Sequence, residues 1–504
     1  MSGGELEGVV LDRDVPAELR GALLEAALAD VAPGAGDVGP DVHGDRFAHD
    51  RVNRTDASFI PGPSGDSCNG ASVRWRAAGP PRCRSTRLGA ESMTTWLGTP
   101  AHARWLESES DALLRFARAS RTPHGFGYLD AGGAVDRARP TELWITCRMV
   151  HAFSLGTLLG RPGYAPLVDH GLACLTETFE DPEHGGWFSA VGPGVAGPTA
   201  GRKEAYPHAF VLLATSSATA AGRSGADELF ARARRVSLER FWREDEGMVV
   251  ESWDRAFTEA EPYRGVNANM HTVEAYLATA DVTGDDVWLD RAVRIVARVV
   301  DRFARAASWR IPEHFDAAWT PLPEYNREDP AHPFRPFGAT VGHWFEWARL
   351  TLQARDALVS RGREAGEWML DGARALFAAG TAEGWAVDGA DGFVYTVDLD
   401  GRPVVRERMH WVLTEALGAA AVLHRVTGGE EYESWYRTWW DYAAEHLLEA
   451  PGAWRHELDA TNLPSSRTWA GKPDVYHALQ ATLLARLPAS PAIAPALAAG
   501  LLDT

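Results

Sequence analysis

Six histidines recur along the chain at intervals of 57 to 72 residues, and each lies near the start of a segment with helical apolar spacing. They are His151, His208, His271, His343, His410 and His477. A single histidine on an apolar helix face is usually a core residue, but core packing does not require an ionisable side chain at six equivalent positions. Histidine titrates at about pH 6.5, so this set suits a general acid and base that takes a proton and returns it.

Two of these histidines have a carboxylate three residues later, as His271 has in Glu274 and His343 has in Glu346. The i, i+3 spacing places both side chains on one helical face. A carboxylate beside an imidazole orients the ring, fixes its tautomer and raises its basicity, although an ordinary helix-surface pair is the alternative for each. His410 has no such partner. Its neighbours are Arg406, Glu407, Arg408 and Trp411.

Such groups fit the isomerisation of an open-chain sugar. A base removes the proton on C2, an enediolate forms, and the proton returns to C1, while a second acid or base opens the ring. No metal or cofactor is required if donors stabilise the enediolate oxygen. Arg148 is a candidate donor, because its guanidinium is planar and always charged.

The elements that would hold these residues are helical. Twelve segments carry apolar residues at i, i+3, i+4 and i+7. The predicted helices span 98–119, 141–160, 163–179, 203–222, 226–243, 267–283, 285–305, 338–356, 361–380, 407–426, 429–449 and 472–487. Every second helix carries one of the histidines, and a glycine with an aromatic or apolar neighbour follows the other helix of most pairs, as in Gly186-Trp187 and Gly392-Phe393.

A period of this kind indicates stacked copies of one supersecondary unit. We predict an all-α fold, an (α/α)6 barrel of six helical hairpins with short β-turn segments at the rim. The histidine-bearing helices would form the inner ring, and the six histidines would point into a common mouth. The barrel domain would span 93–504. Residues 1–92 are rich in Gly, Pro and Ser and are predicted to be a mostly disordered, low-complexity extension.

Composition narrows the possible partners. The formal net charge of −19 argues against nucleic acid, because a phosphate-binding surface needs clustered Lys and Arg. No run of 18 apolar residues exists, so no membrane span is expected, and the N-terminus has no secretory signal pattern. The four cysteines include no Cys-x-x-Cys pair, and Cys147 and Cys174 are predicted to be buried free thiols. These features favour a cytoplasmic protein.

Five segments carry a family resemblance: ELWITCRMVHAFSL, KEAYPHAFVLLA, NANMHTVEAYLA, GHWFEWARL and RMHWVLTEAL. Together they resemble the N-acylglucosamine 2-epimerase superfamily, and within it the aldose–ketose isomerase branch, over about residues 95–487. The resemblance implies an (α/α)6 barrel, no metal, no cofactor and two catalytic histidines.

By this resemblance His271, supported by Glu274, carries the proton between C1 and C2, and His410 supplies the second acid or base; the reverse assignment stays open. Substrate contacts are expected from the other residues of these segments. They are Trp144, Arg148, Tyr206, His208, Asn267, His343, Glu346, Arg408 and Trp411.

The expected reaction is conversion of D-mannose to D-fructose, with D-lyxose to D-xylulose as a side activity. A sulfoquinovose isomerase would need cationic donors, which Arg406 and Arg408 could supply. A sugar 2-epimerase uses the same enediolate and differs in the face of C2 that receives the proton. The partner is therefore a monosaccharide, and the sequence leaves monomer and homo-oligomer open.

Three rival classes remain. A glycoside hydrolase on this fold would use two carboxylates, drawn from Glu274, Glu346, Asp316 and Asp474, but would leave the histidines unexplained. A non-enzymatic binding protein would not need inward-facing histidines and glutamates. A metal site is the third rival, because both residue types are common ligands.

Overall fold

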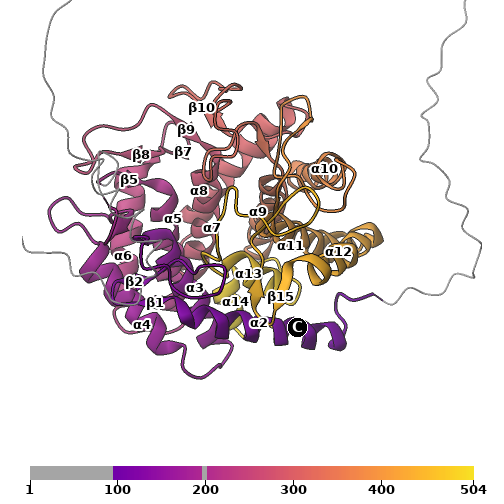
Figure 1. The fold of residues 1–504 in the computed structure, drawn as a ribbon. Helices are drawn as coiled ribbons and strands as arrows, with labels where there is room; N and C mark the ends of the chain where they lie inside the picture. The colour runs from indigo at the N-terminus through magenta and orange to yellow at the C-terminus, as the bar shows by residue number, and fades with distance from the viewer. Residues whose placement is uncertain (1–94, 196–200) are drawn as a thin grey trace, which may run out of the picture. The chain divides into compact units, whose positions relative to one another are not determined.

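A computed structural model describes residues 95–195 and 201–504, in which long helices form two concentric rings (Figure 1). The inner ring comprises α3 (Leu143–Leu158), α5 (Ala205–Ala220), α7 (Val266–Thr283), α9 (Val341–Ser360), α11 (His410–Thr427) and α13 (Tyr476–Leu484). The outer ring comprises α2 (Pro100–Ala117), α4 (Ala165–Cys174), α6 (Ala226–Val236), α8 (Asp286–Val296), α10 (Glu367–Gly384) and α12 (Glu430–Tyr442). The predicted extension 1–92 lies outside the described residues.

Burial patterns explain the two rings. Inner helices are buried on nearly every side, as in α3, where every residue from Leu143 to Gly156 is buried. Outer helices bury one stripe, as in α8, where Trp288, Leu289, Ala292, Ile295 and Val296 follow the spacing of an amphipathic helix. Each inner helix packs against its neighbours, and α13 closes the ring by contacting both α11 and α3. The predicted (α/α)6 barrel is confirmed.

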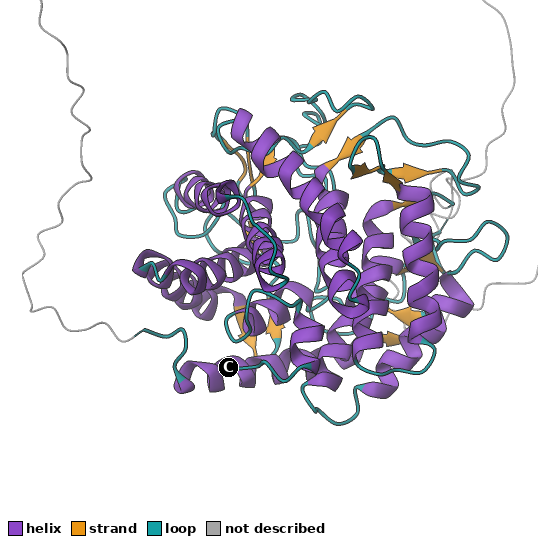
Figure 2. Cartoon of the chain, turned by 180° about the vertical axis from the view of Figure 1, so that it is seen from behind, coloured by secondary structure: helices purple, strands orange, loops and turns teal. Residues whose placement is uncertain are grey.

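Short antiparallel strand pairs lie outside the bodies of the helices (Figure 2). Five inner helices directly follow a strand that pairs with a strand of a later loop. These pairs are β3 (Thr141–Glu142) with β4 (Ala190–Val191), β5 (Lys203–Glu204) with β8 (Ser252–Trp253), β9 (Arg264–Gly265) with β10 (His314–Phe315), β11 (Ala339–Thr340) with β12 (Thr396–Val397), and β14 (Arg408–Met409) with β17 (Glu457–Leu458). The predicted rim segments are therefore present, and they fix the loops that carry part of the pocket.

The remaining strands lie beside the outer helices or extend a rim pair. They are β1 (Arg121–Thr122) with β2 (Gly125–Phe126), β6 (Trp242–Arg243) with β7 (Met248–Val249), β15 (Leu448–Ala450) with β16 (Ala453–Trp454), and β13 (Pro403–Val405), which adds to β12. Four outer helices end in wider π-helical turns, at Leu175–Phe179, Ser237–Phe241, Ala297–Ala304 and Ala443–Leu447.

The predicted helix boundaries differ where glycine and proline intervene. The helix predicted at 361–380 begins at Glu367, because Gly362 takes a left-handed φ of 69° just after α9. The helix predicted at 472–487 begins at Tyr476, whose N–H donates to the Asp474 side chain at 2.8 Å.

The C-terminal segment adds a helix that was not predicted, α14 (Ile493–Ala498), which packs against α3, α5 and α7. Together with Ala489 and Ala492 it lines a small cavity near the C-terminal ends of the inner helices. This end of the barrel is thus closed, and the opposite end holds the pocket described below. Cys147 and Cys174 are buried free thiols, as predicted. None of the helices in the described ranges is long and apolar enough to cross a bilayer.

Candidate active site

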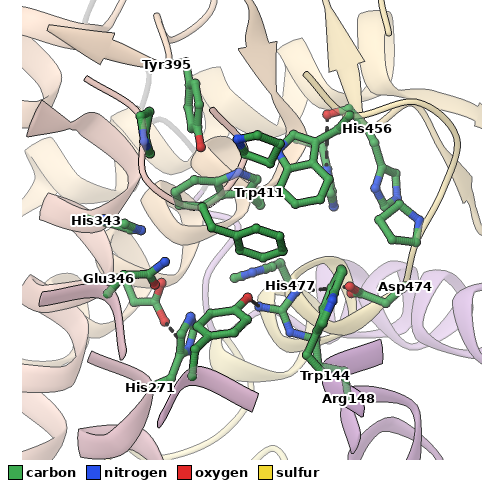
Figure 3. Close-up of a pocket in the computed structure, with 18 residues that line it drawn as sticks. Trp144, Arg148, His271, His343, Glu346, Tyr395, Trp411, His456, Asp474 and His477 are labelled. Carbon is green, nitrogen blue, oxygen red and sulfur yellow. Dashed lines mark hydrogen bonds and ion pairs between the residues drawn. The ribbon is translucent and has the colours of Figure 1, made fainter. Parts of the chain in front are cut away.

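A pocket opens at the N-terminal ends of the inner helices, and all six inner helices contribute side chains to it (Figure 3). Nine residues named from the sequence line it. They are Trp144, Arg148, Tyr206, Asn267, His271, His343, Glu346, His410 and Trp411. The structure adds His477, which belongs to the histidine series but not to the expected substrate contacts. It also adds Asp474 and loop residues that the sequence did not indicate, among them Phe334, Tyr395, His456 and Trp469.

The expectation that all six histidines share one mouth is wrong for two of them. His151 lies more than two turns into α3 and hydrogen-bonds Ser217 through Nδ1 at 2.8 Å. It lines the small cavity near the C-terminal ends of the inner helices, which we call the lower cavity. His208 donates from Nδ1 to the Glu204 carbonyl at 2.6 Å and accepts at Nε2 from the Trp187 N–H at 3.1 Å. Both ring nitrogens of His208 are occupied outside the pocket, so its expected contact with substrate is not supported by its position.

The predicted pairing of His343 with Glu346 is also wrong. His343 donates from Nδ1 to Glu313 at 3.0 Å, and Glu313 lies on the loop before α9. Glu346 is turned toward the neighbouring helix α7, where it lies 3.7 Å from Nδ1 of His271. Glu274 lies at the same 3.7 Å from that nitrogen, beyond hydrogen-bond length. The i, i+3 rule placed these carboxylates near an imidazole but did not identify the closest partners.

The second short carboxylate–imidazole bond belongs to His477, whose Nδ1 donates to Glu415 at 2.9 Å. Glu313 and Glu415 are both buried, and each binds the Nδ1 side of its histidine. This arrangement fixes the tautomer and leaves Nε2 as a bare acceptor on the pocket side. His343 and His477 therefore have the geometry of oriented general bases.

His410 stacks on His456, with ring centroids 3.8 Å apart. The His456 carbonyl accepts from the backbone N–H of His410 at 3.1 Å and lies 3.4 Å from its Nδ1. Nε2 of His410 is buried without a hydrogen-bond partner among the described residues. Burial lowers the pKa of His410 to about 4 and lowers the pKa of His456 well below its ordinary value, so both stacked rings are neutral at pH 7.

Beneath the histidines, three buried carboxylates surround one guanidinium. Arg349 donates from Nε to Glu415 at 3.0 Å and from a terminal nitrogen to Glu346 at 3.3 Å. Glu274 accepts from Gln480 at 2.8 Å and from the Tyr476 hydroxyl. One guanidinium cannot neutralise three carboxylates.

Burial raises the pKa of Glu415 and of Glu346, whereas the pKa of Glu274 is lowered. Burial and repulsion from Glu415 raise the pKa of Glu346 far above its ordinary value. Burial also opposes ionisation of Glu274, but its contact with His271 and the charge of Arg349 bring its pKa below the ordinary value. Glu346 therefore favours the neutral acid, which can donate a hydrogen bond, whereas Glu274 favours the ionised form.

Arg148 supplies the positive charge at the opposite wall. It donates to Asp474 at 3.1 Å and to the Tyr206 hydroxyl at 3.0 Å. Its guanidinium carbon lies 4.4 Å from the Phe210 ring centroid and 5.0 Å from that of Trp144. A planar cation held this way can bind two sugar oxygens without reorganising.

Aromatic rings cover the remaining walls, supplied by Trp144, Tyr206, Tyr395, Trp411 and Trp469. Gly342 makes room for one of them, because a Cβ there would lie 2.3 Å from the Trp411 ring. Flat apolar faces with a polar edge suit the C–H faces of a sugar. Tyr395 and Trp469 lie outside the helices, where no apolar period could indicate them.

Two further expected site residues lie outside the pocket. Arg408 forms a buried bidentate pair with Asp388 at 2.9 and 2.6 Å, which removes it as a donor to a sulfonate group. Glu274 stands behind His271 and lines the lower cavity. Asp474, considered above only as a hydrolase carboxylate, pairs with Arg148.

Within residues 95–195 and 201–504, two groups of buried side chains offer metal-ligand atoms within 4.8 Å of one another: His271 with Glu274 and Glu346, and Glu346 with Glu415 and His477. Arg349 contacts Glu346 and Glu415 directly. Because the Arg349 guanidinium already supplies positive charge there, these two carboxylates have a charged partner that is not a metal ion.

Several known proteins are similar to this chain. A D-mannose isomerase from Thermobifida fusca is 52% identical over 410 residues, which are 81% of this chain and 99% of that protein. A D-mannose isomerase from Pseudomonas cannabina pv. alisalensis is 48% identical over 408 residues, 81% of this chain and 98% of that protein.

Solved structures agree with the fold. The crystal structure of a D-mannose isomerase superposes with a TM-score of 0.71 at 27% identity, over 77% of this chain and 99% of that one. A cellobiose 2-epimerase from Spirochaeta thermophila superposes with a TM-score of 0.65 at 21% identity, over 77% of this chain and 97% of that one, and this likeness concerns the fold alone.

A sequence profile described as N-acylglucosamine 2-epimerase matches residues 125–481. The matched range runs from β2 into α13, so it includes at least part of every inner helix that contributes to the pocket. The histidines, their carboxylates and Arg148 all fall within it. The chain belongs to the N-acylglucosamine 2-epimerase family.

Proposed function

We propose that this protein is an aldose–ketose isomerase that converts D-mannose to D-fructose, with D-lyxose as a second substrate. The observation that carries the proposal is the convergence of four imidazoles of the inner helices on one pocket beside Arg148. Two of them are held by carboxylates as oriented bases. The near full-length similarity to two D-mannose isomerases supports the choice of sugar. The partner is a monosaccharide.

The resemblance assigned the C1–C2 proton to His271 and the second acid–base role to His410, and that assignment stays a proposal. The contacts favour a competing pair, His343 and His477, because each has a short Nδ1 bond to a carboxylate and an Nε2 left for the pocket. In either case a neutral imidazole takes the C2 proton. Arg148 and the neutral acid of Glu346 then offer donors to the enediolate oxygens.

The rival chemistries fit the pocket less well. A glycoside hydrolase needs one free carboxylic acid and one free carboxylate across the scissile bond. Here Glu274 is held by Tyr476 and Gln480, and Asp474 by Arg148. A 2-epimerase needs the same enediolate, so product identity decides between the two. We also propose a cytoplasmic location, which the free thiols of Cys147 and Cys174 favour.

Incubation with D-mannose in heavy water tests the reaction class. We expect D-fructose as the main product, with solvent deuterium at C1 in a fraction of the molecules, because a histidine that carries the proton exchanges it with solvent during some turnovers. Product sugars are identified by chromatography and the label by NMR. D-Glucose as the main product would make the protein an epimerase, and no product with no label would reject the proposal. D-Lyxose, cellobiose and sulfoquinovose in parallel rank the substrates.

The dependence of kcat/KM on pH should reflect the buried imidazoles. Burial lowers the pKa of His271 and of His410 to about 4 and lowers that of His477 well below its ordinary value. A general base must be neutral, so we expect kcat/KM to stay level on acidification to about pH 5.5 and to fall only near pH 4–5. An acid limb centred near the ordinary histidine value of about 6.5 would contradict this expectation.

The same shifts destabilise the fold in acid. An unfolded chain binds protons below about pH 6.5 that His271 and His410 bind only near pH 4 in the folded protein, so stability falls as the pH falls through that range. Circular dichroism at each pH separates loss of fold from protonation of the base.

A further inference from the structure

A cavity on the rim side adjoins the pocket and is distinct from the cavity beside α14. It shares four lining residues with the pocket: Trp144, Tyr206, Asn267 and Phe334. We call it the outer cavity. Polar side chains of the rim line it, including Glu142, Arg202, Glu204 and Glu261. The outer cavity therefore has a mixed polar and apolar lining and shares a wall with the pocket that holds the histidines.

Phe334 is the one of these four shared residues that lies on a loop outside the inner helices. Its ring makes edge contacts with three aromatic rings of the two cavities, at centroid distances of 5.4 Å to Trp469, 5.5 Å to Tyr206 and 6.0 Å to Trp144. Phe334 is 37% exposed although it contacts all three rings. An exposed phenyl ring costs solvation free energy, so its position between two cavities suggests a role other than packing.

The loop that carries Phe334 is held in place on both sides of it. Arg335 forms a bidentate pair with Glu261 at 2.8 and 3.0 Å and lies over the Tyr263 ring at 4.1 Å. The Pro336 carbonyl accepts from His314 at 2.7 Å.

The backbone before Phe334 is fixed as well. Nδ1 of His332 accepts from the backbone N–H groups of Phe334 and Arg335, at 3.2 and 3.0 Å. Prolines at 333 and 336 restrict φ on either side. The ring is thus positioned by its loop, and the partition it forms is a fixed feature of the pocket.

We propose that Phe334 is a specificity determinant that restricts the pocket to free monosaccharides by closing it off from the outer cavity. This inference rests on the proposed function. The histidines must meet C1 and C2, so the far end of the sugar points to the mouth. A second sugar unit on O4 would then extend toward the Phe334 ring. Without that ring the two cavities join, and the rim carboxylates and Arg202 offer hydrogen bonds to the hydroxyls of the added unit.

The test compares Phe334→Ala with Phe334→Tyr, which keeps the ring, and with Trp105→Ala. Trp105 is a matched control because it is 39% exposed and lines a different cavity. D-Mannose and 4-O-β-D-mannopyranosyl-D-mannose are titrated into each variant by calorimetry, and turnover of both sugars is followed in parallel. Thermal unfolding confirms that each variant is folded.

We expect the wild type, Phe334→Tyr and Trp105→Ala to prefer mannose strongly. In Phe334→Ala the ratio of disaccharide to mannose affinity should rise by on the order of tenfold or more, since a steric block is removed and polar contacts are gained. An unchanged ratio in Phe334→Ala, or wild-type binding of the disaccharide equal to that of mannose, would overturn the inference. The affinity ratio tests the role of Phe334 even if neither sugar is turned over. Mannose that binds without turnover would reject only the proposed isomerase activity.

Discussion

Replacing His477 or His343 by asparagine is expected to lower kcat by roughly 10²- to 10⁴-fold, the usual contribution of a positioned acid or base. Asparagine removes the titratable Nε2 but retains a donor that can reach Glu415 or Glu313, so the buried carboxylate keeps a partner. The KM for mannose should change much less than kcat, because the lost interaction belongs to the transition state. Steady-state kinetics and the deuterium content of the product measure both effects.

The same substitution in His271 and His410 discriminates the two proposed pairs. If these rings bind hydroxyls, His271→Asn and His410→Asn should raise KM and retain deuterium transfer. Loss of transfer in these two variants, with transfer retained in His343→Asn and His477→Asn, would establish the pair that the resemblance suggested. His151→Gln is the control, because it removes a buried imidazole of the same series that does not face the pocket. It should cost stability without a comparable loss of rate.

The barrel could be predicted from the sequence because its helical hairpins repeat along the chain. Apolar spacing indicated the twelve predicted helices, and the histidine near the start of every second one indicated their alternation. The position of most of the histidines near the start of their helices was also predictable from the sequence. The boundaries were less predictable where single residues decide, as at Gly362 and Asp474.

Which carboxylate pairs with which histidine could not be predicted from residue spacing. Glu313 and Glu415 lie 30 and 62 residues from the histidines they bind, and helix contacts between distant segments bring them there. The i, i+3 rule placed Glu346 with His343, but α9 directs the two side chains to different neighbours. Phe334 and His456 come from loops, where no period exists and only the folded chain shows that they face the pocket.

Replacing Arg349 by methionine is expected to give the largest loss of stability. The guanidinium is 1% exposed and is shared by Glu346 and Glu415, themselves 0% and 1% exposed. Removing one partner of a buried ionic group leaves uncompensated charge, which costs about 3–5 kcal/mol at pH 7. Urea denaturation of the variant and of the wild type measures the difference. Arg402→Met is the matched control: that side chain pairs with Asp400 at 72% exposure, where solvent screens the ion pair and its loss should change stability little.

The pH dependence of that loss identifies its cause. Without Arg349 both buried carboxyl groups favour the neutral acid, so their folded-state pKa values lie further above those of the unfolded chain. The folded variant then binds more protons than the unfolded one, and its stability rises as the pH falls. The deficit relative to wild type should therefore be largest near pH 8 and smaller near pH 5. A deficit independent of pH would instead indicate lost packing of the arginine stem, and the buried carboxylates would not be the groups that Arg349 holds in place.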